Sequence, residues 1–151
     1  MDPTAVFGDF LRSVLEAAGF KPDGGPWTSR RGDVLLSVRA ERDRVPRTLE
    51  AGVTFGAGPE LFMLRVHQDV LPQDTPKGPM RGEWWSADQP VNEASVVETF
   101  RCHILRFFED TSTREGALAE AEREGKFGDC GPFSRYRPAV NPDALEALLK
   151  S

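Results

Sequence analysis

The sequence predicts an α+β fold, in which an antiparallel sheet of four to five strands is preceded by one helix and followed by two to three helices packed on it. Apolar residues between Val6 and Ala18 recur every three or four positions, as on one face of a helix. After Gly19 and Phe20 they alternate with polar residues, as in half-buried strands. The later segments return to helical spacing, and this order is typical of α+β domains. Residues 1–151 are expected to form one domain.

The first helix is predicted to begin at Asp2 and to end at Gly19. Asp2 can accept hydrogen bonds from the free N–H groups of the first turn, and Pro3 suits the first helical position. Gly19 can adopt the left-handed conformation that ends a helix, with Phe20 folding back on the last turn. The glycine and proline residues of 21–26 then predict a turn or loop.

Four strands are expected in the first half of the chain, each bounded by turn residues such as Gly32-Asp33. In the second strand Val34, Leu36 and Val38 share one face, and Leu35, Ser37 and Arg39 share the other. The predicted strands are Trp27–Arg31, Val34–Arg39, Thr48–Gly56 and Leu61–Val66.

The segment from His67 to Asn92 interrupts this regular order. It contains four prolines, and a long connection of this kind is either functional or contains an unrecognised element. A short strand is suspected at 83–86.

Helix signals return in the last third of the chain. Ser95 with Glu98 matches a capping box, and an apolar stripe follows, formed by Val97, Phe100, Ile104, Phe107 and Phe108. Ser112 with Glu115 matches a second capping box, for a helix ending at Gly125 with a face of small residues (Ala117, Leu118 and Ala121). Asn141 and Pro142 begin a final short helix that carries Leu145, Leu148 and Leu149.

Several of these segments resemble a known group of bacterial proteins. The pieces are FLRSVLEAAGF, DVLLSVRAE, TLEAGVTFG and, ahead of a helix, EWWSADQP, and together they span Phe10 to Phe108. On them, the chain resembles the bacterial domain-of-unknown-function family numbered forty-three-oh-four. The resemblance implies an opening helix, a sheet and a helical C-terminal part, and it implies no activity.

Composition and charge narrow the function classes. The net charge of −5 and pI near 5.1 argue against nucleic-acid binding, which favours a basic excess. The opening MDPTAVFGDF predicts no signal peptide, and no apolar run is long enough to span a membrane. Two cysteines give no disulfide framework, so a cytoplasmic, reduced protein is expected. The segment 30–47 nevertheless holds six arginines against three acidic residues, and it suggests either a solvated hairpin or a surface for an acidic partner.

The usual catalytic and metal-binding patterns are not found. Cys102 and His103 are adjacent, so their side chains are expected to point about 100° apart on a helix and not to share a zinc ion. Cys102 should lie opposite the apolar stripe, and His103 should be a partly buried, hydrogen-bonded side chain at its edge. Cys130, in GDCGPF, has no cysteine-hydrolase signature around it. We therefore expect no catalytic residue, no metal and no cofactor.

The remaining candidates concern recognition. Trp84 and Trp85 would point to opposite faces of a strand, so that one indole could face outward near Arg65 and Arg81. With His67, these residues form the predicted partner- or ligand-binding site. The leading hypothesis is a non-enzymatic bacterial domain that binds another protein, as immunity proteins and antitoxins do. The alternatives are an enzyme or small-molecule-binding domain, with His67 as acid–base between the sheet and residues 67–92, and a subunit that closes a homodimer.

Overall fold

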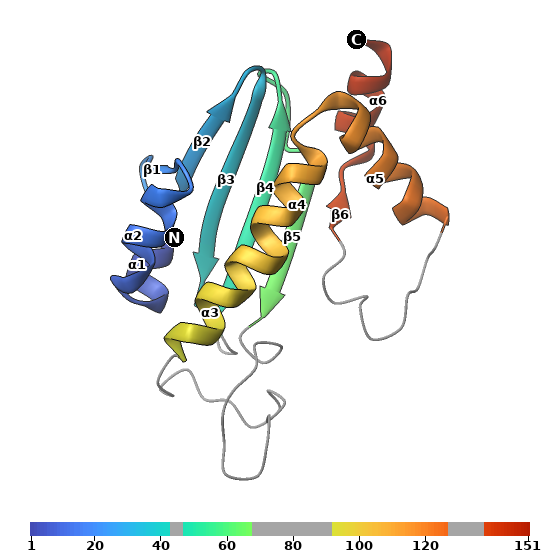
Figure 1. Ribbon diagram of the computed structural model, residues 1–151. Coiled ribbons are helices and arrows are strands. Elements are labelled where there is room, and N and C mark those ends of the chain that lie inside the picture. The colour runs from blue at the N-terminus through green and yellow to red at the C-terminus, as the bar shows by residue number, and fades with distance from the viewer. Residues whose placement is uncertain (43–46, 68–91, 127–137) are drawn as a thin grey trace.

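A six-stranded antiparallel sheet forms the centre of the computed structural model, which describes residues 1–42, 47–67, 92–126 and 138–151 (Figure 1). The strands lie side by side in sequence order, each antiparallel to the next. The predicted α+β class and antiparallel meander are confirmed. The sheet has more strands than predicted because two-residue strands, too short to show an alternating pattern, extend both edges. The strands are β1 (Lys21–Pro22), β2 (Trp27–Arg31), β3 (Val34–Glu41), β4 (Thr48–Phe55), β5 (Phe62–His67) and β6 (Ala139–Val140).

The described helices lie on one face of the sheet and beyond its β6 edge. A continuous helical segment of three parts crosses the sheet in front of β4 and β5 in Figure 1, with a π-helical turn in its middle. The helices are α1 (Pro3–Phe7), α2 (Phe10–Ala17), α3 (Glu93–Thr99), the π-helix η3 (Phe100–Leu105), α4 (Arg106–Thr111), α5 (Arg114–Lys126) and α6 (Pro142–Lys150). None of them covers the opposite face of the sheet, which we call the open face (Figure 1).

The prediction of one uninterrupted first helix is wrong. The chain forms two helices, α1 and α2, because it breaks at Gly8, whose φ of 137° lies outside the helical range. The predicted ends are confirmed. Asp2 caps α1, and Gly19 has a φ of 89° after α2. The N–H of Phe20 donates to the Leu15 carbonyl at 3.0 Å, which turns the Phe20 ring into the core.

Asp2 also ties the helix to the sheet. Its Oδ1 accepts hydrogen bonds from the N–H of Thr4 at 2.9 Å, from the Thr4 hydroxyl at 2.7 Å and from the indole N–H of Trp27 at 3.0 Å. Burial raises the pKa of the Asp2 carboxyl, but the hydrogen bonds from Thr4 and Trp27 and the positive charge of Arg12 outweigh it. The pKa of Asp2 therefore lies below its ordinary value.

This shift predicts a pH-dependent contribution to stability. A carboxyl whose pKa is lowered by folding stabilises the protein fully above its unfolded pKa of about 4, and this stabilisation is lost as the pH falls through the folded value. Asp2→Asn keeps the acceptor but not the charge, so it should cost up to about 1 kcal/mol near pH 6 and less below pH 4. Denaturant unfolding of both proteins from pH 7 to pH 2 measures this difference. Asp9→Asn on the exposed Asp9–Arg12 pair is the control, and a difference for Asp2→Asn that does not change with pH would contradict the assignment.

The two faces of the sheet differ as the alternating pattern predicts. Val34, Leu36 and Val38 of β3 are buried toward the helices, and the buried residues of β4 continue this core face. The core extends from the sheet to the helical layer, and its fully buried large side chains are Leu11, Leu15, Phe20, Trp27, Leu36, Leu49, Leu61, Phe62, Leu64, Phe100 and Phe108.

The long helical segment begins earlier than predicted. Its cap is Asn92, whose side chain accepts from the N–H of Ser95 at 3.1 Å, so Ser95 lies inside the first turn. Val97 is only half-buried, and Val96 is buried in its place. From Val96 the buried positions advance in steps of four, through Phe100 and Ile104 to Phe108. The π turn keeps these positions on one face, because its wider coil absorbs part of the drift that steps of four produce in an α-helix.

The last two helices largely follow the prediction. The hydroxyl of Thr113, rather than that of Ser112, accepts from the N–H of Gly116 at 3.0 Å, so α5 begins one residue later than the capping box suggested. Asn141 caps α6 as predicted, with its side chain accepting from the N–H groups of Asp143 and Ala144. In α6 Leu148 is buried, but Leu149 is 59% exposed and not part of the core.

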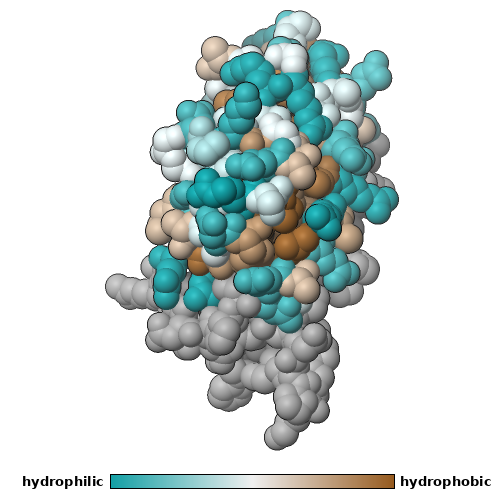
Figure 2. Space-filling model, turned by 60° about the vertical axis from the view of Figure 1, so that its left-hand side comes forward, coloured by the Kyte–Doolittle hydropathy of each residue, from teal (hydrophilic) through white to brown (hydrophobic). Residues whose placement is uncertain are grey.

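Figure 2 shows the side of the molecule on which α1 and α2 lie. Among the residues that Figure 2 colours, hydrophobic ones gather low on this side and hydrophilic ones dominate the rest. Half-buried Phe10 and Val14 of α2 pack against the core. Among the described residues, no helix combines the length and the apolar character needed to cross a bilayer.

Candidate functional site: a charged cluster on the open face of the sheet

Four charged side chains form a connected group on the open face, and we call Arg39, Glu50, Glu60 and Arg65 the charged cluster. The strand register places Glu50 of β4 directly between Arg39 of β3 and Arg65 of β5. Both Nη groups of Arg39 donate to the carboxylate of Glu60, at 2.9 and 3.1 Å, in a fork-to-fork pair. The Nε of Arg65 donates to Oε2 of Glu50 at 2.8 Å, and the Nε of Arg39 lies 4.0 Å from Oε1.

Glu50 is the buried member of the charged cluster. Its side chain is 4% exposed, compared with 27% for Arg39 and 58% for Arg65. A buried carboxylate is costly unless cations and hydrogen-bond donors compensate it, and here two guanidinium groups approach its two oxygens. The buried charge therefore fixes the positions of both arginines.

Gly52 makes room for Glu60 over the sheet. A Cβ at this position would lie 2.0 Å from Oε2 of Glu60 and 2.6 Å from the hydroxyl oxygen of Ser37. The carboxylate can therefore cross over β4 and reach Arg39 only because the residue beneath it has no side chain. Met63, opposite Gly52 on β5, adds its sulfur 3.1 Å from an Nη of Arg39.

Arg65 combines a fixed position with an unused fork. Its Nε is bound to Glu50, and among the described residues its two Nη groups have no acceptor. The side chain is more than half exposed, so these groups are accessible to solvent. A guanidinium held in this way presents two parallel N–H donors, which match a carboxylate or a phosphate.

Other charges surround the charged cluster. The strand register also places Lys21, Arg30 and Glu41 on the open face. Among the described strand residues and Glu60, this gives four cations (Lys21, Arg30, Arg39 and Arg65) and three carboxylates (Glu41, Glu50 and Glu60), whereas the whole chain has a net charge of −5. The open face is thus more positive than the average surface. Two arginines of the predicted basic segment, Arg30 and Arg39, lie here, but Arg47 is 8% exposed.

The structure describes only part of the predicted recognition site. Arg65 lies in β5 within the charged cluster, and His67 is the last residue of the same strand, opposite Thr48. Arg81, Trp84 and Trp85 lie outside the described residues, as does the suspected strand at 83–86.

A second polar group lies on the helical side of the molecule. Cys102 and His103 line one shallow hollow of about 460 Å³ together with Arg106, Asp110 and Glu120. Both residues lie on the π turn η3, and both line this hollow although they are adjacent in sequence. Cys102 is exposed as predicted, but His103 is exposed rather than partly buried.

The hollow does not form a metal centre. Within the described parts of the chain, no three histidine, cysteine or acidic side chains are placed to bind a metal ion. Cys130 lies outside the described residues, so the structure does not test the interpretation of that cysteine.

Sequence reasoning identified Arg65 but missed its partners. Glu50 lies inside the predicted strand Thr48–Gly56 and Glu60 directly before the predicted strand Leu61–Val66, and neither was identified as a site residue. One signal was available, because a glycine inside a strand often marks the close approach of another group. Gly52 is such a glycine, and the group is the Glu60 carboxylate.

Comparisons with known proteins give no relative. A scan against protein-family models matched no family, a search of curated proteins found no match, and a search of solved structures found none either.

Proposed function

We propose that the chain is a non-enzymatic protein-binding domain, of the kind found among immunity proteins and antitoxins, and that Arg65 on the open face is its central contact. The observation that carries this proposal is the guanidinium of Arg65, which the buried carboxylate of Glu50 holds at 2.8 Å and whose two Nη groups have no acceptor among the described residues. The partner group it suits is a surface carboxylate of another protein.

Physical reasoning favours Arg65 as a point of high binding energy. Arginine is enriched among the residues that dominate protein interfaces. A flexible side chain loses conformational freedom on binding, and Arg65 has already lost part of this freedom to Glu50. The surrounding excess of cations on the open face would attract an acidic partner and repel a basic one.

The predicted residues next in the chain extend the same proposal. His67 ends the strand that carries Arg65, and Arg81, Trp84 and Trp85 follow it in sequence. Arginine and tryptophan are both enriched at the centres of protein interfaces. We propose further that the protein acts in the cytoplasm of a bacterium and belongs to the domain-of-unknown-function family it resembles.

The proposal is tested by comparing two arginine variants for loss of a specific partner. Proteins that co-purify with the wild-type chain from its native host are identified, and their binding to Arg65→Ala and Arg12→Ala is measured. A residue that dominates an interface contributes about 2 kcal/mol or more to the free energy of binding, so Arg65→Ala should weaken binding of the specific partner about thirtyfold.

Arg12 provides a closely matched control. It is 48% exposed and its Nε also binds a carboxylate, that of Asp9, at 3.0 Å, but it belongs to α2 and its guanidinium lies over the Trp27 ring rather than in the charged cluster. Arg12→Ala should change partner binding less than about twofold. If no recurring partner is found, or if both variants bind it equally, the proposal is wrong.

A further inference from the structure

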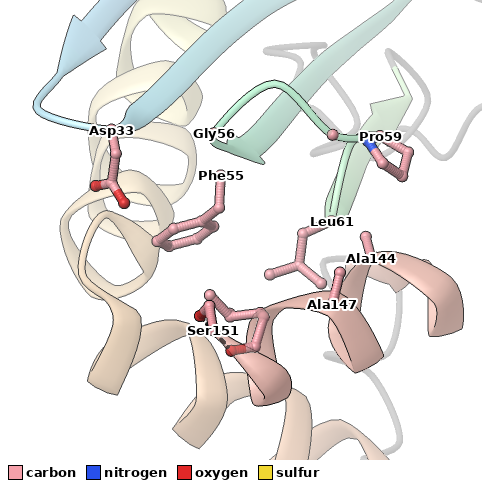
Figure 3. Close-up of a pocket in the computed structure, with 10 residues that line it drawn as sticks. Asp33, Phe55, Gly56, Pro59, Leu61, Ala144, Ala147 and Ser151 are labelled. Carbon is pink, nitrogen blue, oxygen red and sulfur yellow. Dashed lines mark hydrogen bonds between the residues drawn. The ribbon is translucent and has the colours of Figure 1, made fainter.

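A separate cavity lies at the opposite end of the sheet from His67. It has a volume of about 240 Å³ and is enclosed by the β4–β5 turn on one side and by α6 on the other (Figure 3). In Figure 3 the ring of Phe55 and the side chain of Leu61 point from the sheet toward α6, where Ala144 and Ala147 face them. Leu148, buried at the end of α6, completes the apolar part of the wall.

One ionisable side chain lines this apolar cavity. Asp33 belongs to the β2–β3 turn, and its carboxylate lies on the same side of the cavity as the Phe55 ring (Figure 3). Its backbone is fixed, because the N–H of Gly56 donates to the Asp33 carbonyl at 2.7 Å and so joins the two turns. Among the described residues, the Asp33 carboxylate has no hydrogen-bond donor or salt-bridge partner, which leaves its charge available to a ligand.

Two further features favour a positive charge in the cavity. The helix α6 lines the cavity from Ala144 in its first turn to its C-terminal end at Leu148 and Ser151, and at that end the helix dipole attracts cations. The face of an aromatic ring such as Phe55 also attracts a cation. One nearby cation, Arg114, donates to the Leu148 carbonyl at 3.3 Å, but it does not line the cavity.

The volume sets the size of the ligand. An apolar cavity of about 150 Å³ holds a benzene molecule, so the present cavity has room for a ring with a short side chain. We propose that this cavity binds a small organic amine, with the apolar body between Phe55, Leu61 and α6 and the ammonium group at Asp33. This site is independent of Arg65 and of the proposed protein partner.

The experiment compares three ligands of one shape and different charge. The full chain is titrated with 2-phenylethylamine (as its ammonium), 2-phenylethanol and 3-phenylpropanoate, and amide chemical shifts are followed by NMR. The amine should bind with a dissociation constant of the order of 1 mM, shifting the amides of Asp33, Gly56 and Ala147. The alcohol should bind about fivefold more weakly, as expected for loss of one partly exposed charge pair, and the carboxylate more weakly still.

Three variants separate charge from shape. Asp33→Asn should weaken binding of the amine about fivefold, so that the amine and the alcohol bind equally well. Asp23 is an exposed turn aspartate at the other end of β2, and Asp23→Asn should change neither the affinity for the amine nor its preference over the alcohol. Ala147→Phe adds a ring at an exposed helix position and should prevent binding of all three ligands.

Each contrary result overturns the inference. The inference is wrong if 3-phenylpropanoate binds as well as the amine, or if Asp33→Asn still prefers the amine over the alcohol. It is also wrong if the amide chemical shifts do not saturate at ligand concentrations of about 10 mM. Shifts that map away from the β4–β5 turn and α6 also overturn it.

Discussion

Replacing Phe108 by alanine should lower the free energy of unfolding by about 3–5 kcal/mol, the usual cost of removing a fully buried aromatic ring. Phe108 is 0% exposed, and its ring centroid lies 5.7 Å from that of Phe20 and 5.9 Å from that of Phe107. Domains are typically stable by only about 5–15 kcal/mol, so this change should bring the protein close to unfolding.

The position of Phe108 explains the size of the effect. Phe20 links α2 to the sheet, and Phe107 contacts Phe62 of β5 with ring centroids 6.0 Å apart. Phe107 and Phe108 of α4 thus connect the long helical segment to the sheet and to the N-terminal helices. Loss of the Phe108 ring leaves a cavity where these three parts meet, and rigid backbones on every side limit its collapse.

Urea denaturation followed by tryptophan fluorescence, to which buried Trp27 contributes, and by circular dichroism measures this change. Leu149→Ala is the control, because Leu149 is also on a helix but is 59% exposed and should cost less than about 1 kcal/mol. Phe108→Leu, which refills most of the volume, should recover much of the loss. Equal stability of Phe108→Ala and Leu149→Ala would show that the ring is not part of the core.

The sequence predicted the parts of the fold that have a regular period or a clear end. The alternation in β3 placed residues 34–39 on their correct faces, and Asp2, Gly19 and Asn141 act at helix ends as expected. The break at Gly8 was missed because apolar spacing continues across it, from Phe7 to Phe10. The π turn was missed for a similar reason, since a small change in coil width leaves no separate pattern in the residues.

The charged cluster could be predicted less well because it depends on pairing between strands. Arg39, Glu50 and Arg65 become neighbours only through the register of β3, β4 and β5, which no single strand encodes. Glu60 reaches them from a turn across Gly52, and this contact depends on the absence of a side chain. The apolar cavity at Asp33 has the same origin, since it brings together two turns and a helix from distant parts of the chain.

Replacing Arg39 by methionine should lower the free energy of unfolding by about 2–3 kcal/mol, although the residue is on the open face. Arg39 is 27% exposed and holds the Glu60 carboxylate through two hydrogen bonds, and its Nε faces the 4% exposed carboxylate of Glu50. Hydrogen bonds to charged groups contribute about 1.5–3 kcal/mol, and removing one member of a buried ionic group leaves the remaining charge poorly compensated. Methionine retains most of the apolar part of the arginine side chain, so the loss of unfolding free energy reports mainly the interactions of the guanidinium group.

Two comparisons distinguish this effect from a general effect of arginine loss. Arg12→Met removes the exposed pair with Asp9, where both side chains are close to half exposed or more, and the position of the guanidinium over the Trp27 ring, and it should cost about 1 kcal/mol. In a Glu60→Gln background Arg39→Met should cost at least about 1 kcal/mol less than in the wild type, because part of the interaction is already lost. Equal costs for Arg39→Met and Arg12→Met would contradict a structural role for the charged cluster.

Gly52→Ala should disrupt the Arg39–Glu60 ion pair without changing any charged residue. Its Cβ would occupy the place of the Glu60 carboxylate, so the Arg39–Glu60 fork must open, and stability should fall although alanine is otherwise better tolerated in a strand than glycine. In a Glu60→Ala background the carboxylate is absent and the same substitution should cost less, because the Ser37 hydroxyl oxygen, 2.6 Å from the new Cβ, can rotate away. A loss that depends on Glu60 in this way would show that the glycine of β4 exists to let a carboxylate cross the sheet. A loss that is equal in both backgrounds would instead place the conflict in the strand itself, and the charged cluster would then have no part in it.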